Sequence, residues 1–309
     1  MSIKRRQFLA LSGFSFGFAL LGNSLFGKSL WGAGGFAVAA TPEEEALIAN
    51  LRLGEPILRF VAVADTGTGG RGQYAVARAM SRYRQQHSFD FSILAGDNIY
   101  NNGEIEKIGE VFERPYKPLL DSGVKFYACL GNHDIRTGNG DAQVQYAGFN
   151  MQGRHYTFRR EPVQFFALDT NPSADWKTQL AWLDKELSRS DAPWKIVFGH
   201  HPAYSAGLHG GSKRIREALA PLFQKYGVHL YINGHDHNYE RTRSIDGTTY
   251  LTCGAGADIR PVGRSEVTAR SASRLSFAAL DVYAGHILMS AIDADNEIFD
   301  QGVVQLQPA

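Results

Sequence analysis

Five apolar runs in this sequence are each followed, usually across a glycine, by a side chain of a type that binds metal ions. The runs are residues 59–64, 89–94, 125–130, 195–198 and 230–232. The residues that follow them are Asp65, Asp97, Asn132, His200, and the pair His235 and His237. Apolar runs of this length predict buried strands, and in an open α/β sheet ligands bind beyond the carboxyl ends of the strands. The chain must therefore adopt a fold that gathers these strand ends at one edge.

The spacing of apolar residues between and after these runs predicts a mixed α/β fold. Residues 73–87, 175–190 and 212–226 have helical spacing, so the early half should form βαβ units. Residues 249–252, 277–283, 287–292 and 303–306 read as antiparallel strands. We also expect a strand at 163–168, a surface segment at 41–55, a helix from 104 to 114 and a loop at 138–153. No proline-rich or charged linker divides the chain, which favours one domain over residues 41–309.

Residues 1–40 have the pattern of an export signal. The adjacent Arg5 and Arg6, followed by Phe8 and Leu9, resemble a twin-arginine signal, and small residues at 37–39 suggest a cleavage site. The partner would be the twin-arginine export machinery, and the mature protein would be periplasmic or extracellular. The alternative is an uncleaved membrane anchor, because the uncharged run is long enough to span a bilayer. We expect no stable membrane association after cleavage.

The charge balance excludes a nucleic-acid partner. The net charge of the whole chain is +1. The first 40 residues hold four basic side chains and no acid, so the rest of the chain carries about −3.

The types of the strand-end residues favour a pair of transition metals. Oxygen and imidazole ligands suit iron, zinc or manganese better than calcium. Two metals about 3.5–4 Å apart need a shared carboxylate, and such a site can clamp a phosphoryl group. We interpret Asp97 as that shared carboxylate and Tyr100 as a further ligand. Taken singly, each residue could instead be an ordinary turn or capping residue.

These motifs resemble those of the calcineurin-type metallophosphoesterase superfamily, and within it the purple acid phosphatases, small bacterial type. The superfamily usually has Asp-x-His in its first motif, whereas this chain has Gly67 at the third position. Purple acid phosphatases replace the lost histidine by a tyrosine three residues after the bridging aspartate, which is Tyr100 here. The resemblance implies a single-domain sandwich of two mixed β-sheets flanked by helices.

The resemblance also implies the metals and the site residues. Ferric iron would be bound by Asp65, Asp97, Tyr100 and His237. A second, divalent ion (Fe, Zn or Mn) would be bound by Asp97, Asn132, His200 and His235. The residues implied to be catalytic are His133 and His209, and those implied to bind substrate are Asn132, His201 and His209.

The implied reaction is hydrolysis of small phosphate monoesters by a dinuclear metal-activated hydroxide, which is an acid phosphatase activity. One alternative is a phosphodiesterase or phospholipase on the same scaffold. Another is a non-hydrolytic iron redox or phosphate-binding protein. Asp169, which also follows a strand, is a reserve ligand for which we favour a structural role. Arg241 could shape the pocket or form a structural ion pair, and Cys129 and Cys253 read as two buried, unpaired thiols.

Overall fold

A computed structural model describes residues 42–52 and 54–306. The leader predicted over residues 1–40 lies outside this range, and the domain boundaries at 41 and 309 remain predictions. In the range 42–52 and 54–306, no helix is long and apolar enough to cross a membrane.

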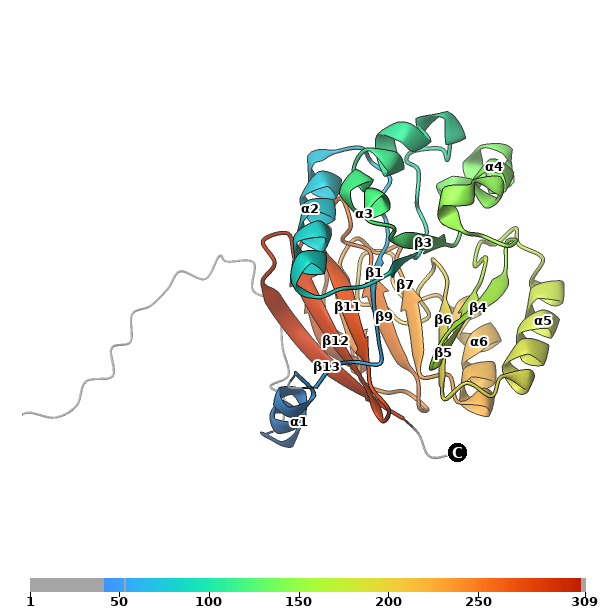
Figure 1. The fold of residues 1–309 in the computed structure, drawn as a ribbon. Coiled ribbons are helices and arrows are strands. Elements are labelled where there is room, and N and C mark those ends of the chain that lie inside the picture. The colour runs from blue at the N-terminus through green and yellow to red at the C-terminus, as the bar shows by residue number, and fades with distance from the viewer. Residues whose placement is uncertain (1–41, 53, 307–309) are drawn as a thin grey trace, which may run out of the picture. The chain divides into compact units, whose positions relative to one another are not determined.

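Two mixed β-sheets make up the centre of the fold (Figure 1). In spatial order the first sheet contains β13 (Ile298–Gln305), β12 (His286–Asp293), β11 (Ser276–Val282), β1 (Leu58–Val63), β2 (Phe91–Leu94) and β3 (Lys125–Ala128). The second contains β10 (Thr268–Ala272), β8 (Tyr239–Thr242), β9 (Thr249–Cys253), β7 (Leu230–Asn233), β6 (Trp194–Phe198), β5 (Val163–Ala167) and β4 (Tyr156–Arg160).

Parallel pairing within each sheet brings the candidate ligands to one edge. Strands β1, β2 and β3 are parallel, and Leu94 pairs with Val63 on one side and Ala128 on the other. Strands β5, β6, β7 and β9 are also parallel, whereas the later strands of the first sheet are antiparallel. The strands that precede the candidate ligands therefore end at matching levels.

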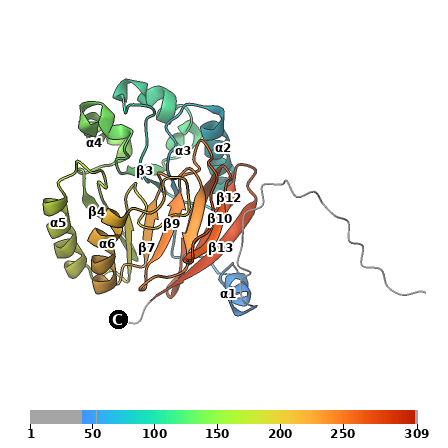
Figure 2. The same cartoon turned by 180° about the vertical axis from the view of Figure 1, so that it is seen from behind.

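Helices cover the outer faces of the two sheets (Figures 1 and 2). The α-helices of the described range are α1 (Pro42–Arg52), α2 (Arg71–Gln86), α3 (Lys117–Asp121), α4 (Asp141–Gln145), α5 (Trp176–Arg189) and α6 (Lys213–Tyr226). Buried side chains of α2 and α3 pack on the first sheet, and those of α5 and α6 pack on the second. The predicted fold class, two mixed sheets flanked by helices, is confirmed.

The inner faces of the sheets share an apolar core. Phe60 and Phe91 from the first sheet meet Phe165 from the second, with ring centroids 5.1 and 5.5 Å away in edge-to-face contact. Because strands in this position bury both faces, they read as continuous apolar runs. Cys129 and Cys253 lie in this core as buried free thiols, as expected.

Several elements differ from the sequence-based expectations. The surface segment expected at 41–55 contains helix α1, and the loop expected at 138–153 contains α4 between two short 3₁₀ helices. The helix expected from 104 to 114 consists of a 3₁₀ turn and a π-helical turn. Strands β4, β8 and β10 were missed. Such short or polar elements form because of their partner strands or other tertiary contacts. They therefore leave no hydrophobic periodicity in the sequence from which they could be predicted.

The first prediction concerns the core between the sheets. Replacing Phe165 by Ala should lower the free energy of unfolding by about 3–5 kcal/mol, because a fully buried ring is lost and a cavity remains. Denaturant unfolding measures this loss. Ile57→Ala, at a side chain that is 59% exposed, is the control and should change stability little. A loss below about 1 kcal/mol for Phe165→Ala would contradict the packing described.

Candidate metal centre

The seven side chains predicted to bind metal converge between the carboxyl ends of the two sheets. Asp65, Asp97 and Asn132 follow β1, β2 and β3 of the first sheet, whereas His200 and His235 follow β6 and β7 of the second. The site is therefore assembled across both sheets, and neither sheet contains it alone.

One cluster of donor atoms surrounds the hydroxyl of Tyr100. This oxygen lies 3.0 Å from Oδ1 of Asp65, 3.0 Å from Oδ2 of Asp97 and 3.1 Å from Nε2 of His237. Metal–ligand bonds of about 2.0–2.2 Å place neighbouring ligand atoms about 3 Å apart. These four donors are thus spaced as ligands of one ion would be.

A second cluster surrounds Nε2 of His200. This nitrogen lies 3.1 Å from Oδ1 of Asn132, 3.3 Å from Nδ1 of His235 and 3.5 Å from Oδ2 of Asp97. Oδ2 of Asp97 therefore belongs to both clusters. Asp65, Asp97 and His200 together meet the spacing expected of a metal-binding triad.

The proton positions indicate that the second cluster needs a cation. Nδ1 of His200 lies 3.0 Å from the carbonyl oxygen of Ala95, which can only accept, so Nδ1 carries the proton. The lone pair of Nε2 consequently faces the oxygens of Asn132 and Asp97. These atoms repel one another unless a positive charge lies between them, so the donor set fits a bound metal ion.

Burial shifts the pKa values of the candidate ligands toward their uncharged forms. It lowers the pKa of His200 to about 3 and that of His235 to about 2, so both imidazoles are neutral and able to ligate. Burial, followed by the charge of Asp97, raises the pKa of Asp65 well above its usual value. Burial also raises the pKa of Tyr100, with Asp65 and Asp97 adding to it. A bound cation would reverse the shifts of these acids.

Backbone geometry at the strand ends is specialised for this arrangement. Asp65, Asp97 and His235 have positive φ values of 56°, 53° and 71°, which is uncommon for residues other than glycine and typical of functional sites. A Cβ on Gly96 would lie 2.6 Å from Nδ1 of His200, so only glycine allows these two strand ends to approach each other.

Gly67 explains why this chain cannot have a histidine in its first motif. A Cβ at this position would lie 2.1 Å from the carbonyl oxygen of Asn98. The Tyr100 N–H donates to the Gly67 carbonyl oxygen at 2.8 Å, so the turn that carries Tyr100 packs directly on Gly67. The glycine and the tyrosine therefore form one structural unit.

Asp134, to which the sequence analysis gave no role, holds two of the ligand turns together. Its buried carboxylate accepts from the backbone N–H groups of Asn98 and Ile99, on the turn between Asp97 and Tyr100, and from the N–H of Gly131. Burial, with the charge of Asp97 next, raises its pKa to about 7. Its only signal in the sequence was its position two residues after Asn132.

The predicted catalytic and substrate-binding histidines border the two clusters. The ring of His133 lies 4.5 Å from that of Tyr100, and the ring of His209 lies 4.4 Å from that of His235. His201 lies 4.7 Å from His235. Its Nδ1 is 2.9 Å from the Thr170 hydroxyl, which already accepts two backbone N–H groups and so donates to this nitrogen. A neutral His201 therefore carries its proton on Nε2.

Other charged residues near the site have structural partners. Asp169 accepts from Arg154 at 2.9 Å and from the Asn171 backbone at 3.0 Å, and Arg241 pairs with Asp300 at 2.8 Å. Asp236 is fully buried and accepts from Ser205 and from the backbone N–H of His209. It thereby fixes the loop that carries His209.

Comparisons with known proteins give the class of this protein. Residues 58–239 match the calcineurin-like phosphoesterase family, and the chain belongs to that family. Its fold and site thus define a phosphoesterase, a hydrolase of phosphate esters, with a dinuclear metal centre implied by its relatives.

Among its relatives is purple acid phosphatase 17 of Arabidopsis thaliana. The two are 33% identical over 240 residues, which cover 66% of this chain and 71% of that protein. The solved structure of purple acid phosphatase PPD1 from yellow lupin (Lupinus luteus) has a TM-score of 0.70 and 20% identity, covering 82% of this chain and 54% of that one. The structure of GAP50, the anchor in the inner membrane complex of Plasmodium, has a TM-score of 0.73 and 22% identity, covering 81% and 89%.

The second prediction tests the shared carboxylate. Asp97→Asn should reduce the metal content from about two ions per chain to one or none, because a neutral amide bridges two cations poorly. Elemental analysis of the purified protein measures this. Asp184→Asn is the matched control, since its carboxylate pairs with Lys225 on the surface. Two ions retained in Asp97→Asn would show that Asp97 is not the bridge.

The third prediction tests the Gly67–Tyr100 unit. Gly67→Ala should destabilise the protein by about 1–3 kcal/mol, because the new methyl group displaces the turn at Asn98. Metal content should fall with it, since Tyr100 moves with that turn. Gly285→Ala is the control, because a Cβ there meets nothing within 4 Å. Equal stability and metal content in the two variants would contradict the close packing.

Proposed function

We propose that this protein is a metal-dependent phosphoric monoester hydrolase, an acid phosphatase of the purple type. The observation that carries the proposal is the pair of donor clusters sharing Oδ2 of Asp97, with the Tyr100 hydroxyl 3.0 Å from that oxygen. A phenolate donor stabilises a trivalent ion. Ferric iron beside Asp65, Tyr100 and His237, with divalent Fe, Zn or Mn beside Asn132, His200 and His235, is therefore the metal pair we infer.

The chain's own residues would bind and orient the phosphoryl group. When bound, the two ions would supply Lewis acidity and lower the pKa of water enough to give a nucleophile in acid. The Nε2–H group of His201 and the side chain of Asn132 would orient phosphoryl oxygens. His133 packs on Tyr100, and its backbone N–H donates to Oδ1 of Asp97 at 2.9 Å, so it would hold both residues in position.

His209 is the residue we assign to protonation of the leaving group. Its Nε2 lies 2.6 Å from Nη1 of Arg260, and a guanidinium can only donate. Nε2 is therefore an acceptor, and a neutral His209 carries its proton on Nδ1. That Nδ1–H group can donate a hydrogen bond to the leaving oxygen. Full proton transfer would come from the imidazolium form of His209, which would be left as neutral imidazole.

The proposed substrates are small phosphorylated molecules, and the proposed compartment is outside the cytoplasm. The purple acid phosphatase relatives support the enzyme class. The export pattern of residues 1–40 supports an exported enzyme, which we propose to be of the small bacterial type. A phosphodiesterase on the same scaffold is the competing activity. A purely structural role, as the name of GAP50 describes for that protein, is disfavoured because this chain has a full set of donors.

The fourth prediction tests the reaction class. The metal-loaded protein should hydrolyse a chromogenic aryl phosphate monoester near pH 5 at least tenfold faster than the matching diester. The physical reason is that two cations and nearby N–H donors suit a dianionic group better than a monoanionic one. Faster hydrolysis of the diester would give the function to the competing phosphodiesterase.

The fifth prediction concerns the proton donor. His209→Ala should slow hydrolysis of esters with poor leaving groups by about 10²–10⁴-fold, and affect good leaving groups much less, because only poor ones need protonation. A series of monoesters with alcohols of graded acidity measures this dependence. His286→Ala, at a histidine on β12 outside the site, is the control. An equal loss across the series would remove His209 as the acid.

A further inference from the structure

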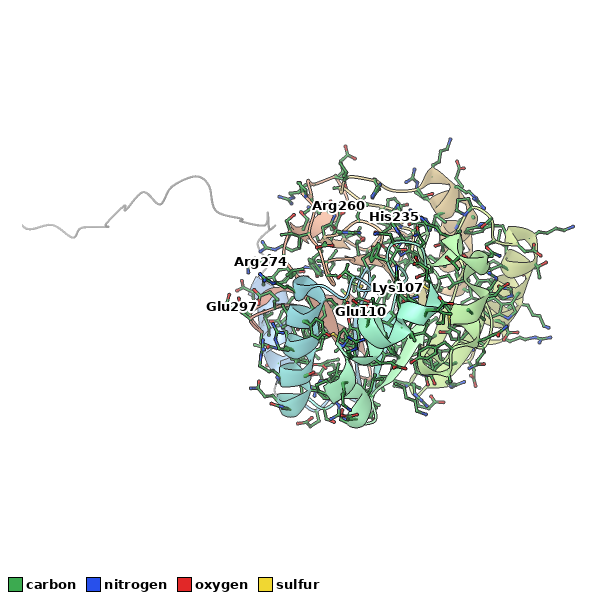
Figure 3. All side chains as sticks on the ribbon, turned by 90° about the horizontal axis from the view of Figure 1, so that it is seen from above. Lys107, Glu110, His235, Arg260, Arg274 and Glu297 are labelled. Atoms are coloured by element: carbon green, nitrogen blue, oxygen red, sulfur yellow. The ribbon has the colours of Figure 1, made fainter. Side chains whose placement is uncertain are left out.

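Two arginines contact the histidines that border the metal centre. Arg260 Nη1 lies 2.6 Å from Nε2 of His209, and Arg136 Nη2 lies 3.3 Å from Nε2 of His133. His209 in turn packs on His235, and His133 packs on Tyr100. Each guanidinium is therefore one side chain away from a candidate metal ligand, and Figure 3 shows Arg260 and His235 on the same face of the molecule.

Neither arginine has a carboxylate partner among the residues that the structure describes. Arg136 otherwise donates to the carbonyl oxygen of Asn101, and the Arg260 side chain makes one hydrogen bond within the described residues, to His209. By contrast, Arg59 and Arg241 each pair with an aspartate within 3 Å. A guanidinium has five N–H donors, so most of those on Arg260 remain available to a ligand.

The backbone of Arg260 is held firmly in place. Its N–H donates to the carbonyl oxygen of His237 at 2.7 Å, and its own carbonyl oxygen accepts from the Ser273 hydroxyl. The loop before it is fixed to the end of β1 by the bond from Gly256 N–H to the Ala64 carbonyl oxygen, at 3.2 Å. The cation is thus positioned from the same segments that carry the candidate ligands.

The loop of Arg260 is also tied to the loop of His209. Gly207 and Val262 form an isolated antiparallel bridge, and Gly263 N–H donates to the Ala206 carbonyl oxygen at 3.0 Å. Asp236 accepts a hydrogen bond from the His209 backbone and so fixes that loop. The loops that carry Arg260 and His209 are therefore both held in place and joined to each other. Such preorganisation is expected of a binding group more than of a solvated surface cation.

We propose that Arg260 and Arg136 bind oxygens of the substrate phosphoryl group, as anion-binding residues beside the metal centre. This inference rests on the proposed function, because it names residues that would recognise the phosphoryl group at that same site. The planar fork of a guanidinium matches phosphate oxygens, and each arginine adds positive charge where a dianion would enter. An incoming phosphoryl oxygen would give each arginine the negatively charged partner that it lacks among the described residues.

The test measures binding of inorganic phosphate to the metal-loaded, full-length protein by calorimetric titration. Arg260→Gln and Arg136→Gln should each weaken binding by roughly tenfold to a hundredfold, since each removes a charge-assisted hydrogen bond. KM for a phosphate monoester should rise by a similar factor. Arg260→Lys should recover part of the loss, because it restores the charge without the fork. Arg264→Gln, an exposed arginine of the same loop, is the matched control and should bind phosphate as wild type does.

The outcomes separate this proposal from the proposed function. Unchanged phosphate affinity and KM in both glutamine variants would overturn the inference, even if the wild type is an active phosphatase. A change in thermal stability alone, with affinity unchanged, would overturn it as well and make the arginines merely structural. If the wild type binds phosphate but hydrolyses no ester, the proposed function fails, whereas the titrations of the variants still decide the role of the arginines.

Discussion

The carboxylate of Asp97 is the group on which the two halves of the site depend. Its Oδ2 lies 3.0 Å from the Tyr100 hydroxyl and 3.5 Å from Nε2 of His200, and its Oδ1 accepts from the His133 backbone at 2.9 Å. Tyr100 lies in the turn after β2 of the first sheet, and His200 lies just after β6 of the second. Ions bound at this carboxylate would therefore join the sheets, so that metal binding and stability of the fold are linked.

Without a bound cation, the arrangement of the site lowers the stability of the folded state. Buried acids, lone pairs that face one another and positive φ values at Asp65, Asp97 and His235 each cost free energy, of order 1–3 kcal/mol for each strained backbone position. The close packing at Gly67 and the hydrogen bonds accepted by Asp134 hold these groups in place. Strain of this kind persists only where the surrounding structure determines it, and at these three residues it lies at the strand ends that carry the candidate ligands.

The sequence predicted the strands and helices that bury apolar faces, because burial leaves a periodic record. It also predicted which side chains would follow the strand ends, and those side chains do converge. It did not predict β4, β8 or β10, whose formation depends on partner strands. The roles of Asp134 and Arg260 were not predicted from the sequence for a related reason. Their importance lies in contacts with segments distant in the sequence, such as Arg260 with His209, and no local spacing reports such contacts.

The most direct test of the account is the visible absorption spectrum of the metal-loaded protein, recorded beside that of a Tyr100→Phe variant. The Tyr100 hydroxyl stands 3.0–3.1 Å from three other donors, so a ferric ion in that cluster would be bound to phenolate. The account predicts a charge-transfer band in the wild type that disappears in the variant while the iron content is retained. Two results would contradict the assignment of Tyr100 as the ligand that defines this centre. One is a charge-transfer band that persists in Tyr100→Phe, and the other is an active, iron-loaded wild type without such a band.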